Sequence, residues 1–297
     1  MQYKKREYLR HPYYTIRKTM SKSLLYLSRL SNIAGDFLEP NKWLSREDKR
    51  ILLRNREIKD VYKGKRCFIL GTGPSLNQCN LDFISDEISI GINSIWHHKD
   101  FHKWEPKAIC YTHPIREEFE KSSSWELYFR EFRKKVNKSI LFTRLKEKEI
   151  IGGRDLFPKD RVRYFEFGKA MHKTKKFDFD LTHTIPGSKT VAQTAIVTAI
   201  YMGCNPIYLL GLDHNWLSYR GKTPHFYSDK DAIIEEEIGS TDSYTYDVQC
   251  GEHIMVWRAY MALKRNAKRF GIEIYNASAE SFLDIFPFVK YDELFKK

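Results

Sequence analysis

The sequence predicts an α/β fold: a Rossmann-like, mainly parallel sheet with helices on both faces, preceded by a basic helical arm. Short apolar runs alternate with longer segments of helical pattern from about residue 61 onward, an order typical of parallel strands joined by crossover helices. The chain has 297 residues, of which 42% are hydrophobic, and this suffices for one large domain with its own core. We therefore expect an arm over residues 1–60 and an α/β domain over residues 61–297.

The arm holds most of the excess positive charge. The formal net charge of the chain is +13, and residues 1–66 contain 18 Lys and Arg against 7 Asp and Glu, which leaves +11 there. A basic amphipathic helix in this arm suits an anionic membrane surface, and it equally suits packing on the domain or on a neighbouring subunit. Its apolar residues recur at helical spacing, with basic residues on the other faces: Ile16, Met20, Leu24 and Leu27.

Cysteine usage and the lack of a leader segment favour a cytoplasmic location. The five cysteines are odd in number and scattered, without a Cys-x-x-Cys pair, so neither a disulfide framework nor a zinc site is indicated. No segment resembles a signal peptide, and no apolar run approaches the ~18 residues of a membrane span. We expect a cytoplasmic protein that lies on the inner membrane face through residues 1–40.

The first half of the chain's regular structure begins with a capped helix and continues with four strands. Ser45 suits the N-cap of a helix over residues 46–60, whose first turn is acidic. Each strand is a short apolar run bounded by Gly, Pro or polar residues, and a charged helix over residues 117–136 separates the last two. The strands are expected at Arg66–Leu70, Ile88–Asn93, Lys107–Tyr111 and Ser139–Thr143.

The second half resumes the alternation after a segment of unclear pattern. Residues 151–180 mix glycines, charges and phenylalanines, and we interpret them as a mobile insert. Small residues over Thr190–Met202 predict a buried helix, which is followed by a strand over Pro206–Leu210. The remaining elements are a polar loop, a long helix and a last strand, expected at residues 215–243, 253–270 and 273–275.

The most informative segment follows the first strand, where the chain reads Gly71-Thr72-Gly73-Pro74-Ser75. Such a turn presents backbone N–H groups and a hydroxyl at the carboxyl edge of a parallel sheet, where a nucleotide phosphate or ribose can approach closely. The third glycine of a dinucleotide fingerprint and the Gly-Lys-Ser/Thr of a P-loop are both missing, which argues against NAD and against ATP bound in Walker fashion. A tight turn without a ligand is the simpler alternative.

Other polar residues are expected at the same edge of the sheet. Two end the second strand, one follows the late strand, and three open the buried helix, whose N-terminus favours an anion. The hydroxyls of the last group could instead only cap the helix, and the aspartate after the late strand could only order a loop. With the glycine turn, the residues of this predicted nucleotide site are Asn93, Ser94, Gly187, Ser188, Thr190 and Asp213.

Three residues are candidates for catalysis. Histidine is the natural general base near neutral pH. His214 follows the late strand, and His225 lies in a Pro-His-Phe-Tyr segment that could close over a substrate. Tyr227 could donate a proton to a leaving phosphate. A solvated side chain is the alternative for each loop histidine.

Metal chemistry has only one weak candidate. Asp178-Phe179-Asp180 spells an Asp-x-Asp, which holds a divalent metal in many sugar transferases. Two-residue motifs arise easily by chance, and this one lies in the segment of unclear pattern. We therefore expect no metal ligands and no required cofactor, and no motif of a hydrolase or a metalloprotease is evident.

Taken in order, these motifs resemble the MptE-like domain family, which is named for an archaeal 6-hydroxymethylpterin diphosphokinase. Many bacterial members of that family look like enzymes of surface-glycan assembly. The resemblance covers roughly residues 61–297 and excludes the basic arm. The segments that carry it are Phe68–Leu76, Ile90–Asn93, Gly187-Ser188, Gly203–His214, His225–Asp229 and Ile274–Ala277.

The same order is similar to that of bacterial lipooligosaccharide sialyltransferases, whose Gly-Asn-Gly-Pro-Ser-Leu turn binds CMP-sialic acid. The resemblance implies that His225 deprotonates the acceptor hydroxyl, without a metal. It also implies contacts to the nucleotide from the turn, to the ribose or base from the second strand, and to the sugar-nucleotide from the buried helix. The residues at those positions are Gly71, Gly73 and Ser75, then Asn93, then Thr190.

This sequence departs from those sialyltransferases at two positions. Thr72 replaces the asparagine of their turn, and Asn215 stands where an aromatic residue follows their Gly-Ile-Asp. The identity of the donor sugar is therefore open.

We expect a glycosyltransferase that moves a sugar, sialic-acid-like in the favoured version, from a CMP-linked donor to a surface polysaccharide or a lipid-linked glycan. The alternative is a 6-hydroxymethylpterin diphosphokinase-type pyrophosphoryl transferase, which would use ATP and Mg²⁺. A third interpretation, a non-catalytic protein that binds nucleotides or nucleic acid, draws on the net charge of +13. We do not expect nucleic acid as a partner, and a homo-oligomer is compatible with the sequence.

Overall fold

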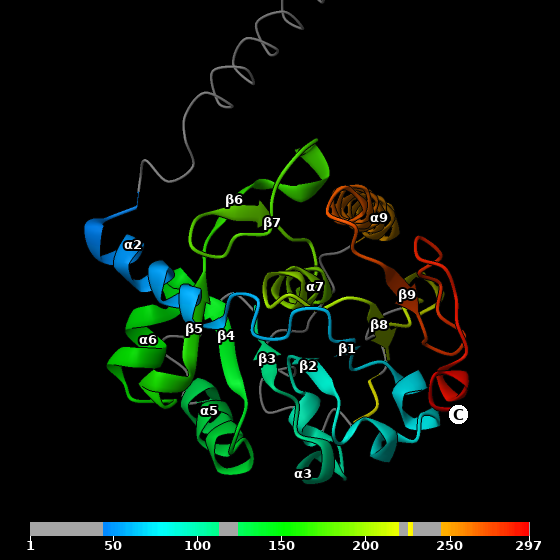
Figure 1. Ribbon diagram of the computed structural model, residues 1–297, viewed down its shortest axis with the longest axis horizontal. Helices are drawn as coiled ribbons and strands as arrows, with labels where there is room; N and C mark the ends of the chain where they lie inside the picture. Colours follow the sequence, from blue (N-terminus) through cyan, green and yellow to red (C-terminus); the bar gives the residue numbers. More distant parts are fainter. Residues whose placement is uncertain (1–43, 113–123, 220–224, 228–244, 297) are drawn as a thin grey trace, which may run out of the picture. The chain divides into compact units, whose positions relative to one another are not determined.

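The computed structural model describes residues 44–112, 124–219, 225–227 and 245–296. Seven strands form one sheet in the order β5-β4-β3-β2-β1-β8-β9, which Figure 1 shows from left to right. Every neighbouring pair is parallel, so the predicted parallel sheet is confirmed. The strands are β1 (Cys67–Leu70), β2 (Ile88–Ile92), β3 (Ala108–Cys110), β4 (Ile140–Arg144), β5 (Val162–Phe165), β8 (Ile207–Leu210) and β9 (Ile274–Asn276).

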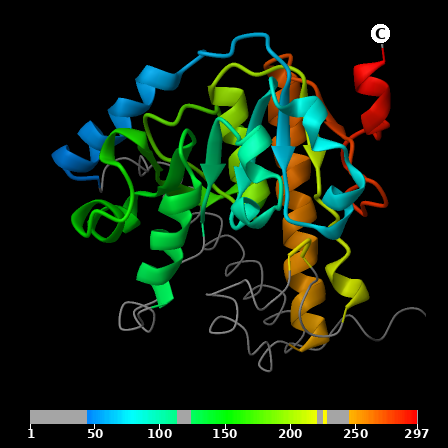
Figure 2. The same ribbon diagram turned by 90° about the horizontal axis from the view of Figure 1, so that it is seen from below.

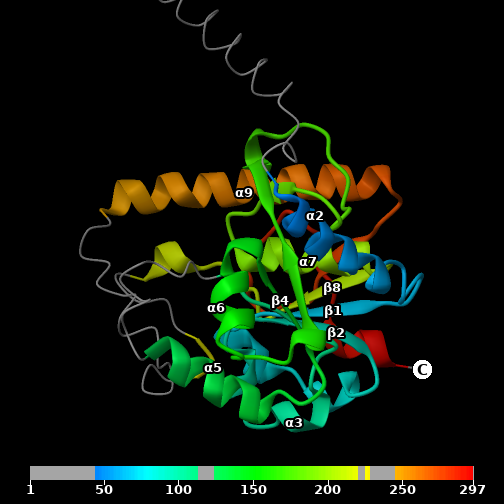
Figure 3. The same cartoon turned by 90° about the vertical axis from the view of Figure 1, so that its left-hand side faces the viewer.

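Helices cover both faces of this sheet, as the sequence predicts (Figures 1 and 3). On one face, α7 (Val191–Tyr201) packs against β1, β2 and β3, and α9 (Tyr246–Arg269) lies beside α7. On the other face lie α3 (Phe101–Trp104) and α5 (Ser124–Lys135). All eleven residues of α7 are buried, because this helix of small and apolar side chains lies between the sheet and α9.

The connectivity creates a switch point between β1 and β8. From β1 the chain moves outward through β2, β3, β4 and β5, and it returns to the other side of β1 to form β8 and β9. In open parallel sheets the crevice beyond the carboxyl ends of two such strands is the usual ligand site. The N-terminal half of α9 extends past these carboxyl ends (Figures 2 and 3).

The segment at residues 151–180 is regular structure, and the interpretation as a mobile insert is wrong. It contains the end of α6 (Lys148–Gly153), the edge strand β5 and strand β6 (Phe167–Ala170), which pairs with β7 (Ile185–Gly187) in a small second sheet. The buried Arg163 interrupts the apolar pattern of β5. Its guanidinium forms an ion pair of 2.7 Å with Glu57, a compensation that the local sequence does not reveal.

The compact α/β unit begins at Ser45, so the domain starts about 15 residues before the boundary expected between residues 60 and 61. Ser45 caps α2 (Arg46–Leu53) through a capping box with Asp48, as predicted, and a 3₁₀ turn continues to Ile58. Leu52 is fully buried, and the Nδ2 of Asn55 donates to the carbonyl oxygens of Tyr164 and Leu181 at 2.8 and 2.7 Å. Residues 45–58 are therefore part of the domain.

Several predicted elements extend beyond the residues that the structure describes. Residues 1–43 of the predicted arm lie outside them, as do residues 117–123 of the helix predicted from 117 and most of the loop predicted over 215–243. The last helix, α9, begins at Tyr246, seven residues before the predicted start. Within the described ranges, no helix is long and apolar enough to cross a membrane.

Candidate functional site

A cavity of about 540 Å³ opens at the switch point between β1 and β8. The turn after β1, the end of β2, the N-terminus of α7 and the segment after β8 all contribute to its wall. Of the residues predicted for the site, those that line this cavity are Thr72, Gly73, Asn93, Ser188, Thr190, Asp213, His214 and His225. The fold thus brings together residues that are more than 150 positions apart in the sequence.

The two turns that follow β1 and β8 touch each other directly. The N–H of Gly71 donates to the carbonyl of Leu210 at 2.7 Å, and that of Gly73 donates to Gly211 at 2.9 Å. A Cβ on Gly71 would overlap the carbonyl oxygen of Gly211 and lie 2.6 Å from a methyl of Leu212. Gly71 is absent from the described lining of the cavity, so this glycine allows one turn to pack on the other, which corrects its predicted contact with a nucleotide.

Asp213 fills the anion position of the glycine turn. Its Oδ2 accepts the N–H of Ser75 at 3.1 Å, and its Oδ1 accepts the Ser75 hydroxyl. Both residues are buried, and a Cβ on Gly73 would lie 2.6 Å from the Asp213 carboxyl carbon. The predicted contact of Ser75 with a nucleotide is therefore corrected, because the carboxylate of the chain itself takes both donors, and neither Pro74 nor Ser75 belongs to the described lining.

The N-terminus of α7 points its remaining donors at the cavity. Thr190 and Gln193 form a capping box, in which the Oε1 of Gln193 accepts the N–H groups of Lys189 and Thr190 at 2.8 and 3.3 Å. The next two residues, Val191 and Ala192, line the cavity. Their N–H groups have no partner inside the helix, so they remain for an anion. Gly187 is the last residue of β7, before the N-terminus of α7, and it does not belong to the described lining.

His225 is held at the cavity by the glycine turn. Its Nδ1 lies 3.1 Å from the Oγ1 of Thr72, and the N–H of Phe226 donates to the Thr72 carbonyl at 2.9 Å. When Nδ1 donates its proton to Thr72, Nε2 carries the lone pair that a general base needs. Tyr227 stacks on His225, with ring centroids 4.9 Å apart, but it lines a second cavity instead of this one, so its predicted role at the leaving phosphate has no support in the geometry.

His214 belongs to the wall of the cavity and is unsuited to be the base. Its Nε2 lies 2.9 Å from the hydroxyl of Tyr260, its ring also bonds to the backbone of Leu212, and it stacks on Trp216. Burial lowers the pKa of His214 to about 3. The Tyr260 hydroxyl also lies 3.3 Å from the Oγ1 of Thr190, so His214 ties the segment after β8 to α9 and α7.

Sequence reasoning missed one cation of the site. Arg144, the last residue of β4, lines the cavity with its guanidinium 5.6 Å from the ring centre of Phe167. Lys189 also lines it and forms an ion pair of 3.0 Å with Glu252 of α9. Since the described lining has one carboxylate, Asp213, which is already hydrogen-bonded, the cavity favours an anion. Residues at the carboxyl ends of parallel strands face the ligand crevice. Applied to β4, this rule could have identified Arg144, as it identified Asn93 at the end of the second strand.

Two oxygen atoms at the cavity have no hydrogen-bond partner among the described residues. They are the Oδ1 of Asn93 and the Oγ of Ser188, and both are shielded from solvent. Asn93 also has a positive φ of 45°, which an asparagine tolerates better than most residues. Ser94, by contrast, turns toward Tyr128 at 3.4 Å and does not belong to the described lining. Buried polar atoms without partners are uncommon, and a bound ligand can satisfy them.

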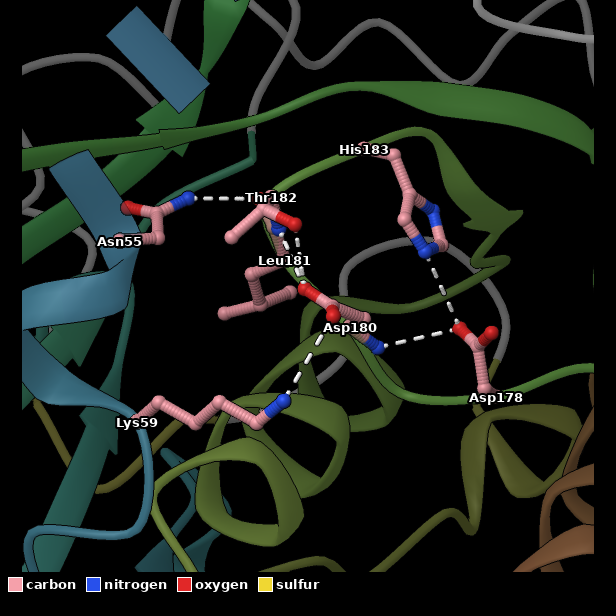
Figure 4. A network of polar contacts seen from close by, with 7 residues as sticks. All are labelled: Asn55, Lys59, Asp178, Asp180, Leu181, Thr182 and His183. Carbon is pink, nitrogen blue, oxygen red and sulfur yellow. Dashed lines mark hydrogen bonds and ion pairs between the residues drawn. The ribbon is translucent and has the colours of Figure 1, made fainter. Parts of the chain in front are cut away.

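The Asp-x-Asp segment has a structural role (Figure 4). The Oδ1 of Asp178 accepts the N–H of Asp180 at 3.1 Å and lies 3.5 Å from the Nε2 of His183. The Oδ1 of Asp180 accepts the N–H and the hydroxyl of Thr182, and its Oδ2 lies 3.7 Å from the ammonium of Lys59. In the described ranges, no three His, Cys, Asp or Glu residues are grouped as a metal site.

Comparison with known proteins finds a likeness among solved structures. No family model and no curated protein matches the sequence. Among solved structures, the fold is similar to a crystal structure of the sialyltransferase CST-II, a point variant in complex with CMP. The two share 15% sequence identity over 76% of this chain and 86% of that chain, with a TM-score of 0.45. A likeness this distant does not fix the activity.

Proposed function

We propose that this protein is a glycosyltransferase that binds a nucleotide-sugar in the switch-point cavity and uses His225 as its general base. The observation that carries the proposal is the hydrogen bond between His225 and Thr72 at the rim of a cavity with cationic walls. One wall supplies donors for a phosphate, namely the N-terminus of α7 with Lys189 and Arg144. The other supplies a base whose ring is oriented by the same glycine turn.

The reaction is a displacement at the anomeric carbon of the donor sugar. The acceptor oxygen forms the new bond to that carbon while its proton passes to the Nε2 of His225. The bond between the carbon and the phosphate oxygen breaks, and its electron pair leaves with the nucleotide. Thr72 accepts from Nδ1–H and so stabilises the protonated ring, while the α7 N–H groups and the two cations stabilise the leaving phosphate.

The substrates that fit this proposal are a CMP-linked acidic sugar and a surface or lipid-linked glycan. Two separate cations at one cavity, Arg144 and Lys189, suit a donor with a phosphate and a second anionic group. The basic arm over residues 1–40 would hold the enzyme where a lipid-linked acceptor is made. A diphosphokinase would need carboxylates for Mg²⁺, and Asp213 is committed to Ser75.

The test is a nucleotide screen followed by one substitution. CMP, CDP, UDP, GDP and ATP are added with and without Mg²⁺, and CMP is expected to raise Tm without the metal, since a ligand at 100 times its Kd stabilises by about 2.7 kcal/mol. His225→Ala should reduce CMP release from CMP-sialic acid about 100- to 10,000-fold and keep the CMP response. The exposed His102→Ala is the matched control.

Two results contradict the proposal. A rise in Tm with ATP and Mg²⁺ and none with CMP would favour the pyrophosphoryl transferase instead. Full turnover in His225→Ala would show that another group takes the proton.

A further inference from the structure

A second cavity, of about 550 Å³, shares a wall with the first. His225 lines the switch-point cavity, whereas Phe226 and Tyr227 line this one. The ring of Phe226 lies 5.4 Å from that of His98, and the ring of Tyr227 lies 5.2 Å from that of His97. Because Tyr227 also stacks on His225, one aromatic ring separates the second cavity from the proposed base.

The lining of the second cavity has the composition of a site for a neutral polyol. Asn77, Asn80 and Asp82 are exposed on its rim, and amide and carboxylate groups are suited to bind neighbouring hydroxyls. Tyr227 is half-buried and adds an aromatic ring to the lining, against whose edge the C–H groups of a sugar ring can pack. Trp104 also belongs to the lining. This mixture differs from the cationic wall of the first cavity.

The charges of the second cavity are nearly balanced, which disfavours an ionic ligand. Asp100 forms an ion pair of 2.9 Å with Lys103, and the lining also holds Lys99 and Asp82, one charge of each sign. Burial lowers the pKa of His98, and its Nδ1 accepts the N–H of Asp100, so this histidine is neutral near pH 7.

An unpartnered donor also points to a ligand. Trp104 is 1% exposed, and no described residue accepts a hydrogen bond from its Nε1–H. An indole N–H that is buried without a partner destabilises the folded protein. A hydroxyl oxygen of a bound sugar is a fitting acceptor for it.

We propose that the second cavity is the acceptor site, in which a neutral hexose or N-acetylhexosamine of the growing glycan lies against Tyr227. This inference rests on the proposed function, since it places the acceptor across the 225–227 wall from the donor. For transfer, a hydroxyl of that sugar must pass the edge of the Tyr227 ring to reach His225 in the first cavity, where the bond between the acceptor oxygen and the donor carbon is made.

The experiment measures sugar and nucleotide binding separately on the full chain. Saturation-transfer NMR is recorded with galactose, glucose, N-acetylgalactosamine and lactose, and the Tm response to CMP is measured on the same samples. The test variant is Asn77→Ala with Asp82→Ala, both at exposed rim positions. The matched control is Gln78→Ala with Asp86→Ala, two exposed neighbours outside the described lining.

At least one sugar should bind the wild type and the control, and its Kd should rise about tenfold or more in the test variant, as expected for one lost hydrogen bond to a charged group. The CMP response should be unchanged in all three proteins. Binding of none of the four sugars, or equal binding in the test variant, overturns the acceptor site. A third outcome is that sugar binding is lost in the test variant while no nucleotide changes Tm in any of the proteins. That result would support a sugar site in the second cavity and would contradict the proposed transferase activity.

Discussion

Burial decides what each polar side chain of the site can do. The carboxylate of Asp213 lines a cavity, yet it accepts two hydrogen bonds from Ser75 and so stabilises the glycine turn. His214 is fully buried with a depressed pKa, whereas His225 is partly exposed and oriented by Thr72. The two histidines are eleven positions apart in the sequence, and only the second has the surroundings of a base.

The pH dependence of stability should reveal His214. Its pKa is about 3 in the folded protein, against the ordinary histidine value of 6.5 in the unfolded chain. Between those values the unfolded chain binds a proton that the folded chain excludes, so stability falls as the pH drops from about 6.5 toward 3, by up to ~1.4 kcal/mol per pH unit. Between pH 7 and 5 this residue alone should remove about 2 kcal/mol.

Urea unfolding at pH 7 and pH 5 measures this loss. His214→Asn should be less stable than the wild type at pH 7 but should lose less on acidification. The exposed His102→Asn should keep the wild-type difference. An unchanged difference in His214→Asn would show that this residue is charged in the folded protein.

The elements of the fold meet most tightly where β1 and β8 end. Strands β1 and β8 lie side by side in register from Cys67 opposite Ile207 to Leu70 opposite Leu210. Beyond them, the turn after β1 donates two backbone hydrogen bonds to carbonyls at the end of β8, and Gly211 has a positive φ of 65°. The shape of the switch-point crevice therefore depends on glycines that let two backbones approach each other.

Gly71→Ala should destabilise the protein by about 3 kcal/mol or more, because its Cβ would overlap the backbone of the opposite turn. The expected result is a large fall in the urea midpoint, or failure to fold. Gly153→Ala is the matched control, since a Cβ there would meet no atom within 4 Å, and its midpoint should stay near that of the wild type. Equal midpoints for the two variants would contradict the close packing of the turns.

At the scale of the whole molecule, two halves of a parallel sheet diverge from the β1/β8 junction, and residues 45–58 join the first half to the segment before β7. The buried Asn55 bonds to Tyr164 and to Leu181, which are 109 and 126 positions away. The domain thus depends on a helix that the sequence alone assigns to the arm.

Chains that begin at different residues should separate the roles of the arm and of α2. A chain beginning at Ser45 should unfold at the same urea concentration as the full chain and should no longer float with anionic liposomes. A chain beginning at Val61 should be less stable by several kcal/mol, since it lacks the buried Leu52 and the hydrogen bonds of Asn55. If the chain that begins at Ser45 still binds the liposomes, the arm is not the membrane anchor.

Local patterns were enough to predict most of the regular structure and the place of the site. The apolar runs of β1, β2, β3, β4 and β8 are short and bounded by polar residues, and buried strands of a parallel sheet read this way. The edge strand β5 escaped prediction because its Arg163 looks exposed in sequence but pairs with Glu57. Likewise, α9 begins earlier than its apolar pattern, since its first turns are largely exposed.

By itself, the sequence predicted that a parallel sheet would gather Thr72, Asn93 and Thr190 at one edge, because strand ends and helix starts are set by residues close together in the chain; it placed His225 only in a loop that could close over a substrate. Only the tertiary structure decided which polar groups face a ligand. Ser75 and Asp213 satisfy each other across 138 positions, and Arg144 reaches the same cavity from β4. A side chain bonds to whatever group the fold brings within hydrogen-bond distance, and the separation of two residues along the chain does not determine their distance in space.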